Sequence, residues 1–213
     1  MPIDADDLAG LLPPLDPAPG PQLTGAGSAD GLSFTGLQLT GDATAARFLE
    51  CVLADCDLTG VAFDRARFTS CQLADVRAPT WSLVDATLLD VVATGGRFGA
   101  LTAHGSRLTR VLLDGLKVDF ADLGSATLVD VTFTGCAFGE LDLTSADLRE
   151  VRFTDCTVES LVLTGARSRS VDLRGAAILR VDGVADLAGC TISPAQLTGW
   201  AAAMAAQLDI TVD

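Results

Sequence analysis

The sequence predicts an all-β solenoid in which the chain turns a corner every five residues and closes a square coil every twenty. Every fifth residue from Phe48 to Gly183 belongs to one series of 28 positions, and 20 of these positions hold Leu or Phe. The residues two places earlier form a second track, which repeats in steps of twenty. One of its columns is almost entirely alanine: Ala46, Ala66, Ala86, Ser106, Ala126, Ala146 and Ala166.

A period of five fits neither a helix nor a single strand. On an α-helix, successive Leu residues would lie roughly 140° apart around the axis, so no apolar stripe would form. On a strand, an odd step places them on opposite faces. The residue two after each Leu or Phe is mostly Gly, Asp or Ser, and these types suit tight turns. The pattern therefore buries every Leu only if the backbone bends once per repeat.

Individual repeats resemble a known family. Residues 46–50, 121–125 and 146–150 read Ala-Arg-Phe-Leu-Glu, Ala-Asp-Leu-Gly-Ser and Ala-Asp-Leu-Arg-Glu. This is similar to the pattern of the pentapeptide-repeat family. The resemblance implies a right-handed quadrilateral parallel β-helix, and it extends in size and fold to the bacterial members that imitate DNA and bind gyrase.

The repeat divides the chain into three parts. Residues 1–31 are expected to form an N-terminal cap, partly irregular, with a short helix around residues 4–12. Residues 32–192 are expected to form about eight coils, with slips in the period near 40–45 and 183–187. At about 4.8 Å per layer this column is roughly 38 Å long. Residues 193–213 are expected to form a C-terminal helix and a short strand at 210–212, because Ser193, Pro194 and Gln196 make a capping box with proline in the first turn.

The C-terminal helix carries no charged residue between Pro194 and Leu208. Two interpretations remain open: the helix caps the open end of the column, or it caps the column and also forms a homodimer contact. The second is favoured, partly because some members of the family that the chain resembles dimerise through this segment. The candidate dimer contacts are Leu197, Trp200, Met204 and Leu208.

The composition argues against an enzyme. A single His and no Tyr leave few groups for proton transfer, and no nucleophile–base pair can be assigned. His104 is expected to be a solvated surface residue. The Cys residues occupy the small inward track and are expected to be free thiols that act as small hydrophobes. No cofactor and no metal site are predicted. The inward Cys residues are Cys51, Cys56, Cys71, Cys136 and Cys156, and Cys190 continues the track after the second slip.

The stretch 76–106 departs from the pattern. The Leu/Phe track holds Ala78, Ala93 and Ala103 there, and the small track holds Gly96 and Ser106. Large neighbours are expected to refill these layers, since protein interiors pack at crystal-like density. The alternative is a local dent that is used for binding. The large inward neighbours are Trp81 and Leu101.

The charge and the hydropathy pattern limit the partners and the location. The formal net charge is −14, which disfavours direct binding to nucleic acid because that binding requires cations for the phosphates. No apolar run approaches the roughly 20 residues of a membrane span. The acidic, Pro-rich start is unlike a secretory signal, and six Cys fit a reducing compartment. A cytoplasmic protein that does not act at a membrane is expected.

The outer faces suggest two functions. The preferred one is a non-catalytic, rigid scaffold that binds a protein partner. The alternative, suggested by the resemblance, is a partial DNA mimic that binds DNA gyrase or topoisomerase IV. Duplex DNA of the same length carries roughly 22 charges, whereas the repeat region holds 14 basic and 19 acidic residues, so any mimicry is partial. The candidate partner contacts are an acidic set, Asp64, Asp85, Asp122, Asp142 and Asp182, and an arginine line, Arg47, Arg67, Arg107 and Arg167.

Overall fold

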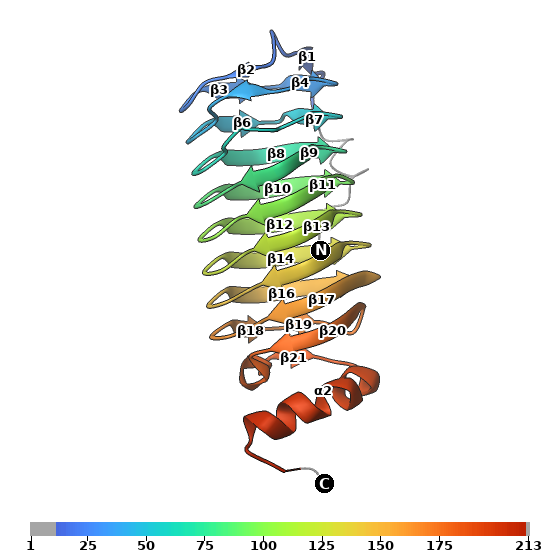
Figure 1. Ribbon diagram of the computed structural model, residues 1–213. Coiled ribbons are helices and arrows are strands. Elements are labelled where there is room, and N and C mark those ends of the chain that lie inside the picture. The colour runs from blue at the N-terminus through green and yellow to red at the C-terminus, as the bar shows by residue number, and fades with distance from the viewer. Residues whose placement is uncertain (1–11, 212–213) are drawn as a thin grey trace.

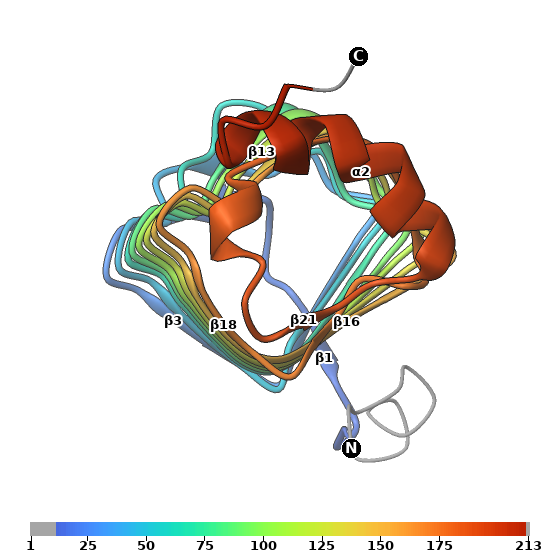
Figure 2. The same ribbon diagram turned by 90° about the horizontal axis from the view of Figure 1, so that it is seen from below.

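The computed structural model describes residues 12–211 and shows a column of about nine stacked coils, with one helix at its C-terminal end (Figure 1). Viewed along its axis, the column has a four-sided outline (Figure 2). We call the four sides the first to fourth faces. They start at Ala46, Cys51, Cys56 and Val61, and each face recurs every twenty residues.

All strand pairs are parallel, and from residue 47 to residue 182 nearly every strand pairs with the residue twenty positions further on. One sheet wraps the first and second faces. Its long strands are β8 (Arg67–Ala74), β10 (Thr87–Thr94), β12 (Arg107–Asp114), β14 (Thr127–Thr134) and β16 (Asp147–Thr154). The same sheet contains the shorter strands β1 (Asp16–Pro17), β3 (Ser28–Asp30), β4 (Leu32–Thr35), β6 (Arg47–Leu49), β7 (Val52–Ala54), β18 (Arg167–Arg169), β19 (Val171–Asp172) and β21 (Cys190–Thr191).

A second sheet covers the third face and turns into the fourth. Its strands are β9 (Arg77–Ser82), β11 (Arg97–Thr102), β13 (Lys117–Asp122), β15 (Ala137–Asp142), β17 (Cys156–Val162) and β20 (Ala176–Asp182). A separate pair, β2 (Gln22–Leu23) and β5 (Thr40–Gly41), lies at the N-terminal end. The fold class expected from the five-residue period is confirmed.

The corners explain the residues found at the turn positions. In the regular coils, the residue that ends the first, second and fourth faces has a positive φ, as at Asp90 (55°), Gly115 (68°) and Ser125 (55°). Gly, Asp and other small polar residues tolerate this left-handed conformation best. Past Gly60, the corner between the third and fourth faces has no positive φ. Phe120 stands at this corner and is partly exposed.

The column interior is filled by the two inward tracks, and most of these side chains are less than 5% exposed. Aromatic rings stack from coil to coil: Phe48 lies 4.7 Å from Phe68, and Phe133 lies 4.7 Å from Phe153. In the irregular stretch, Trp81 stacks on Phe98 with ring centroids 5.0 Å apart. Large rings therefore fill the layers that the small residues of this stretch leave open.

The N-terminal coils are shorter than twenty residues. Residues 16–30, expected within the cap, contain β1, β2 and β3, which pair in parallel with the following coil at offsets of 16 to 19 residues. The slip near 40–45 is a shortened face, because Ala43 is buried where the next coil has Phe63. Gly41 makes this possible, since a Cβ there would lie 2.3 Å from the Leu23 carbonyl oxygen. The expected helix around 4–12 lies almost wholly outside the described residues.

The C-terminal end is closed by α2 (Pro194–Gln207), which follows the short 3-10 helix η1 (Val184–Asp186) and packs on β20 and η1. The capping box is present: the Ser193 side chain accepts from the Gln196 amide, and Gln196 Oε1 accepts from the Ser193 amide. Gln196 Nε2 also donates to the carbonyls of Leu173 and Ala176 at 2.8 and 2.9 Å. One side chain thus caps both the helix and the last coil. Residues 210–211 are not in a strand, and residue 212 lies outside the described part.

Candidate protein-binding surfaces

The thiols face the interior of the column. Cys51, Cys71, Cys136 and Cys156 are buried and free, and their Sγ atoms donate to backbone carbonyls, as Cys71 does to Phe48 at 3.4 Å. A hydrogen bond with the stacked thiol of Cys51, together with burial, raises the pKa of Cys71.

Within residues 12–211 no group of three or more potential metal ligands converges. No helix in the same range is long and apolar enough to cross a membrane.

The acidic set lies on the fourth face as predicted by the twenty-residue register. Asp122 and Asp142 are direct neighbours on adjacent strands, Val162 follows, and Asp182 continues the column. Several of these carboxylates also hold the local backbone. Asp122 and Asp142 each accept from the amide two residues ahead at 2.8 Å. The acidic face is therefore partly used for turn geometry.

The two remaining members of the acidic set differ in exposure. Asp64 accepts from the Ser82 hydroxyl and the Val84 amide, and it is partly covered. Asp85 is exposed at the next corner. His104, also on this face, is exposed and lies 3.4 Å from Asp122 Oδ1 through its Nδ1. The fourth face thus combines free carboxylates with carboxylates already used as acceptors.

The arginine line lies on the first face. Arg47 and Arg67 are direct neighbours on β6 and β8, and Arg107 and Arg167 follow after interruptions by threonine and aspartate. All four side chains are exposed, and none has an ion pair within residues 12–211. Other arginines of the same face are paired: Arg110 makes two hydrogen bonds to Asp90, and Arg149 pairs with Asp147 at 2.8 Å. The predicted line therefore presents free positive charge.

Sequence analysis missed a second basic column, on the third face. Three basic residues occupy consecutive coils at the same strand position: Arg77, Arg97 and Lys117. No neutral or acidic residue interrupts this column between them. We call these three residues the basic ladder. Arg77 lies 3.9 Å from Asp57, whereas Arg97 and Lys117 have no ion pair among the described residues. The ladder recurs in steps of twenty at outward positions, which is the same sequence signal that identifies the arginine line.

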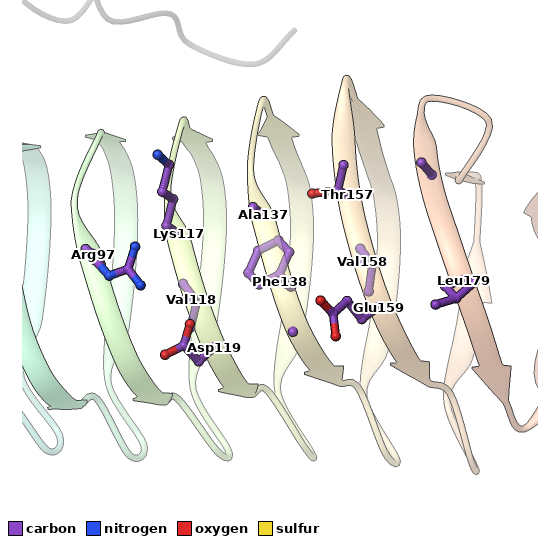
Figure 3. A pocket seen from close by; sticks show the side chains of 12 residues that line it. Arg97, Lys117, Val118, Asp119, Ala137, Phe138, Thr157, Val158, Glu159 and Leu179 are labelled. Carbon is purple, nitrogen blue, oxygen red and sulfur yellow. The ribbon is translucent and has the colours of Figure 1, made fainter.

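The surface around the basic ladder is hollowed. Three shallow depressions, with volumes of about 380, 460 and 400 Å³, all include Arg97 in their walls. One runs from Arg97 and Lys117 past Asp119 to Leu179, as Figure 3 shows. The hollow has a structural cause in Gly99 and Gly139, which place no side chain on the outer surface.

Gly96 gives the corner beside the ladder a backbone conformation that favours glycine. Its φ is 98°, although it occupies a small-track position where neighbouring coils have Val76 and Leu116. A Cβ at Gly96 would lie 2.6 Å from the Val76 carbonyl oxygen, so no other residue fits without a shift of the backbone. The depression at this corner is lined by Gly95, Gly96, Gly115 and the ladder, together with Asp75 and Val76. The irregular stretch is therefore filled inside and has a depression outside, and the use of that depression in binding stays a prediction.

The candidate dimer contacts divide into two sets. Trp200 is 3% exposed and Met204 is partly buried, and both pack on the core of their own chain. Leu197 and Leu208 are 53% and 69% exposed. Only the second pair is available to another molecule.

These features define a parallel β-solenoid with an apolar core and charged outer faces. The sequence model of the family described as "Pentapeptide repeats" matches residues 126–165, in eight copies. Residues 126–165 therefore contain the repeats of pentapeptide-repeat proteins, as the sequence predicted.

Solved structures of two such proteins align with the chain. A trypsin-treated variant of QnrB1, a plasmid-mediated fluoroquinolone resistance protein, aligns over 88% of this chain and 100% of its own, with 16% identity and a TM-score of 0.42. HetL, a pentapeptide repeat protein involved in heterocyst differentiation regulation from the cyanobacterium Nostoc sp. strain PCC 7120, aligns over 82% of this chain and 92% of its own, with 18% identity and a TM-score of 0.35. No curated protein matches the chain.

Proposed function

We propose that this protein is a non-catalytic scaffold that binds a partner protein on the outer faces of its column, in the cytoplasm. The observation that carries the proposal is the arginine line, whose four exposed guanidinium groups have no ion pair within residues 12–211, while neighbouring arginines do. Charged groups across an interface mainly set specificity and association rate. A stacked parallel sheet holds such groups at fixed spacing, which favours recognition by a complementary acidic surface.

Affinity capture tests this function. The wild-type protein should retain one specific protein, and reversal of Arg47, Arg67, Arg107 and Arg167 to Glu should abolish its capture. A matched control reverses four arginines outside the line, Arg65, Arg152, Arg169 and Arg180, and should leave capture intact. Capture that survives in the first variant would exclude the arginine line as the contact.

The second candidate function is binding to DNA gyrase or topoisomerase IV by partial mimicry of DNA. It is supported by the adjacent carboxylates of Asp122 and Asp142 on the fourth face, which Asp182 extends. The test is gyrase supercoiling with titrated protein. Inhibition or protection from quinolones at micromolar protein, lost in an Asp122→Asn/Asp142→Asn/Asp182→Asn variant, would support it. No effect at that concentration would exclude it.

We further propose that the scaffold is a homodimer through α2. The helix has no charged residue, and Leu197, Leu208 and Ile210 are exposed around it. Light-scattering mass should show a dimer for the wild-type protein and a monomer for Leu197→Glu/Leu208→Glu. These two side chains lie outside the core, so the variant should keep its fold. A wild-type monomer would end this proposal.

A further inference from the structure

The basic ladder places three like charges side by side at a cost. Arg97 lies directly opposite Arg77 on one neighbouring strand and opposite Lys117 on the other. Like charges at directly opposed positions of a sheet destabilise it. Among the described residues only Arg77 has a carboxylate within 4 Å, that of Asp57, at an exposed site where an ion pair contributes little. Asp75 and Asp119 line the same depressions but make no ion pair with the ladder among these residues. An arrangement that breaks a local rule with little internal compensation is expected at a functional site.

The geometry of the ladder fits an extended anionic ligand. One coil rises about 4.8 Å, so the three cations cover roughly 10 Å along the column. An extended peptide places alternate side chains about 6.6–6.8 Å apart on one side. Two or three carboxylates at alternate positions therefore reach the ladder, because Arg and Lys side chains are long and flexible. The depressions beside Arg97 leave room for the backbone of such a segment.

The rest of the groove favours a peptide over nucleic acid. Beyond the ladder the groove is lined by Ala137 and Ala177 and ends at Leu179, whose side chain is 72% exposed (Figure 3). Asp119 and Glu159 also line it, so a ligand must place its negative charges at the ladder and not along the whole groove, which a continuous run of phosphates does not do. A peptide can place carboxylates at the ladder and an apolar side chain at Leu179, whereas a phosphate backbone has no apolar group for that end.

We propose that the basic ladder, Arg77, Arg97 and Lys117, is a docking site for an acidic, extended segment of a partner protein, lying along the column axis toward Leu179. This inference rests on the proposed scaffold function and adds a second contact, on a different face from the arginine line. The occupant is recognised by alternating carboxylates followed by an apolar residue.

The test is fluorescence anisotropy with a dye-labelled ten-residue peptide that carries three alternating glutamates followed by a leucine. Wild-type protein should bind it, and binding should weaken as salt rises. The Arg77→Gln/Arg97→Gln/Lys117→Gln variant should bind at least tenfold more weakly. The matched control, Arg65→Gln/Arg152→Gln/Arg169→Gln, removes the same charge from exposed arginines outside both the ladder and the arginine line, and should stay within twofold of wild type. Circular dichroism and thermal unfolding should show both variants folded.

Each other outcome overturns the inference in a defined way. Equal loss in the two variants would mean unspecific attraction to any basic surface. Tighter binding of pyrophosphate or of a single-stranded oligonucleotide, lost only in the ladder variant, would assign the ladder to phosphates instead. A wild-type dimer that becomes a monomer in the ladder variant would identify a second copy as the occupant. None of these results affects the capture experiment on the arginine line, so failure of the ladder and failure of the scaffold function remain distinguishable.

Discussion

Two stretches of the column, 76–106 and 121–165, differ in sequence regularity but share one backbone path. In 121–165 the inward tracks hold Leu, Phe, Ala, Val and Cys without exception, and this stretch includes the segment that the family model matches. In 76–106 the tracks are interrupted five times. Both stretches nevertheless pair at the same twenty-residue offset and are buried to the same degree.

The comparison shows that the interior constrains volume more strongly than residue type. Stacking of Trp81 on Phe98 replaces the side chains that Ala78 and its neighbours lack. The outside is less constrained, so the same stretch carries the left-handed backbone at Gly96 and two members of the basic ladder. The irregular repeats of 76–106 therefore differ from the regular coils in their outer surface, whereas their interior stays equally buried.

The largest effect is expected from the ring that refills the irregular layers. Phe98→Ala should lower the free energy of unfolding by about 3–5 kcal/mol, because the side chain is 1% exposed and its removal leaves a cavity beside Trp81. Phe138→Ala, at the same column of the regular stretch, is the matched variant and should cost as much. Urea denaturation measures both. A cost for Phe98→Ala below about 1 kcal/mol would show that the irregular stretch is loosely packed.

A smaller effect on the free energy of unfolding is expected at Gly96, at the corner beside the basic ladder. Gly96→Ala should cost about 2–3 kcal/mol, since its φ of 98° and the Val76 carbonyl oxygen both oppose a Cβ. Gly60→Ala is the control: its φ is 81°, but a Cβ would meet no heavy atom within 4 Å. It should cost only about 1 kcal/mol. Equal costs, measured by the same denaturation, would contradict the special role of Gly96.

Ser106 offers a stabilising change. Its hydroxyl is buried in the column that otherwise contains alanine, and it has no hydrogen-bond partner in the part of the chain that the structure describes. Ser106→Ala should raise the free energy of unfolding by about 1 kcal/mol, because an unsatisfied buried polar group is removed. Ser28→Ala, at an exposed position, should change it by less than about 0.5 kcal/mol. Destabilisation by Ser106→Ala would indicate that the hydroxyl has a partner in solution.

The smallest effect concerns an exposed ion pair near the regular end. Hydrogen bonds from Arg174 lower the pKa of Asp172. A carboxyl whose pKa is lower in the folded state stabilises the protein above the pKa of the unfolded state and loses this contribution as the pH falls below it. Asp172→Asn should therefore reduce the difference in melting temperature between pH 7 and pH 3 slightly, and high salt should erase the effect, since the pair is exposed. A larger acid sensitivity in the variant would contradict this sign.

The sequence predicted the regular coils well because each position of a twenty-residue coil has one environment. The corner residues, the inward Cys residues and the capping box of Ser193 all follow from local rules. The coil formed by residues 16–30 was not predicted, since its offsets of 16 to 19 residues break the period. The burial of Trp200 and the exposure of Leu197 depend on how α2 sits on the column, which helical periodicity alone does not determine.

Among the candidate surfaces, the arginine line and the acidic column were predicted because their members recur in steps of twenty. The basic ladder has the same signal, but net charge hides it: acidic residues such as Asp57, Asp119 and Glu159 balance the third face. The ladder is distinguished because its three basic residues are neighbours on adjacent strands, which the net charge of the whole face does not reveal. The hollow beside it depends on the backbone at Gly96 and was visible in the sequence only as an irregularity.

Native-state hydrogen exchange tests the central claim most directly, namely that 76–106 and 121–165 have one equally well-packed interior under different surfaces. The account predicts that the slowest amides of β9, β10 and β11 exchange at rates within about tenfold of those of β14, β15 and β16, through the same global opening. Exchange more than a hundredfold faster in 76–106 would show that this stretch opens on its own and would contradict the claim.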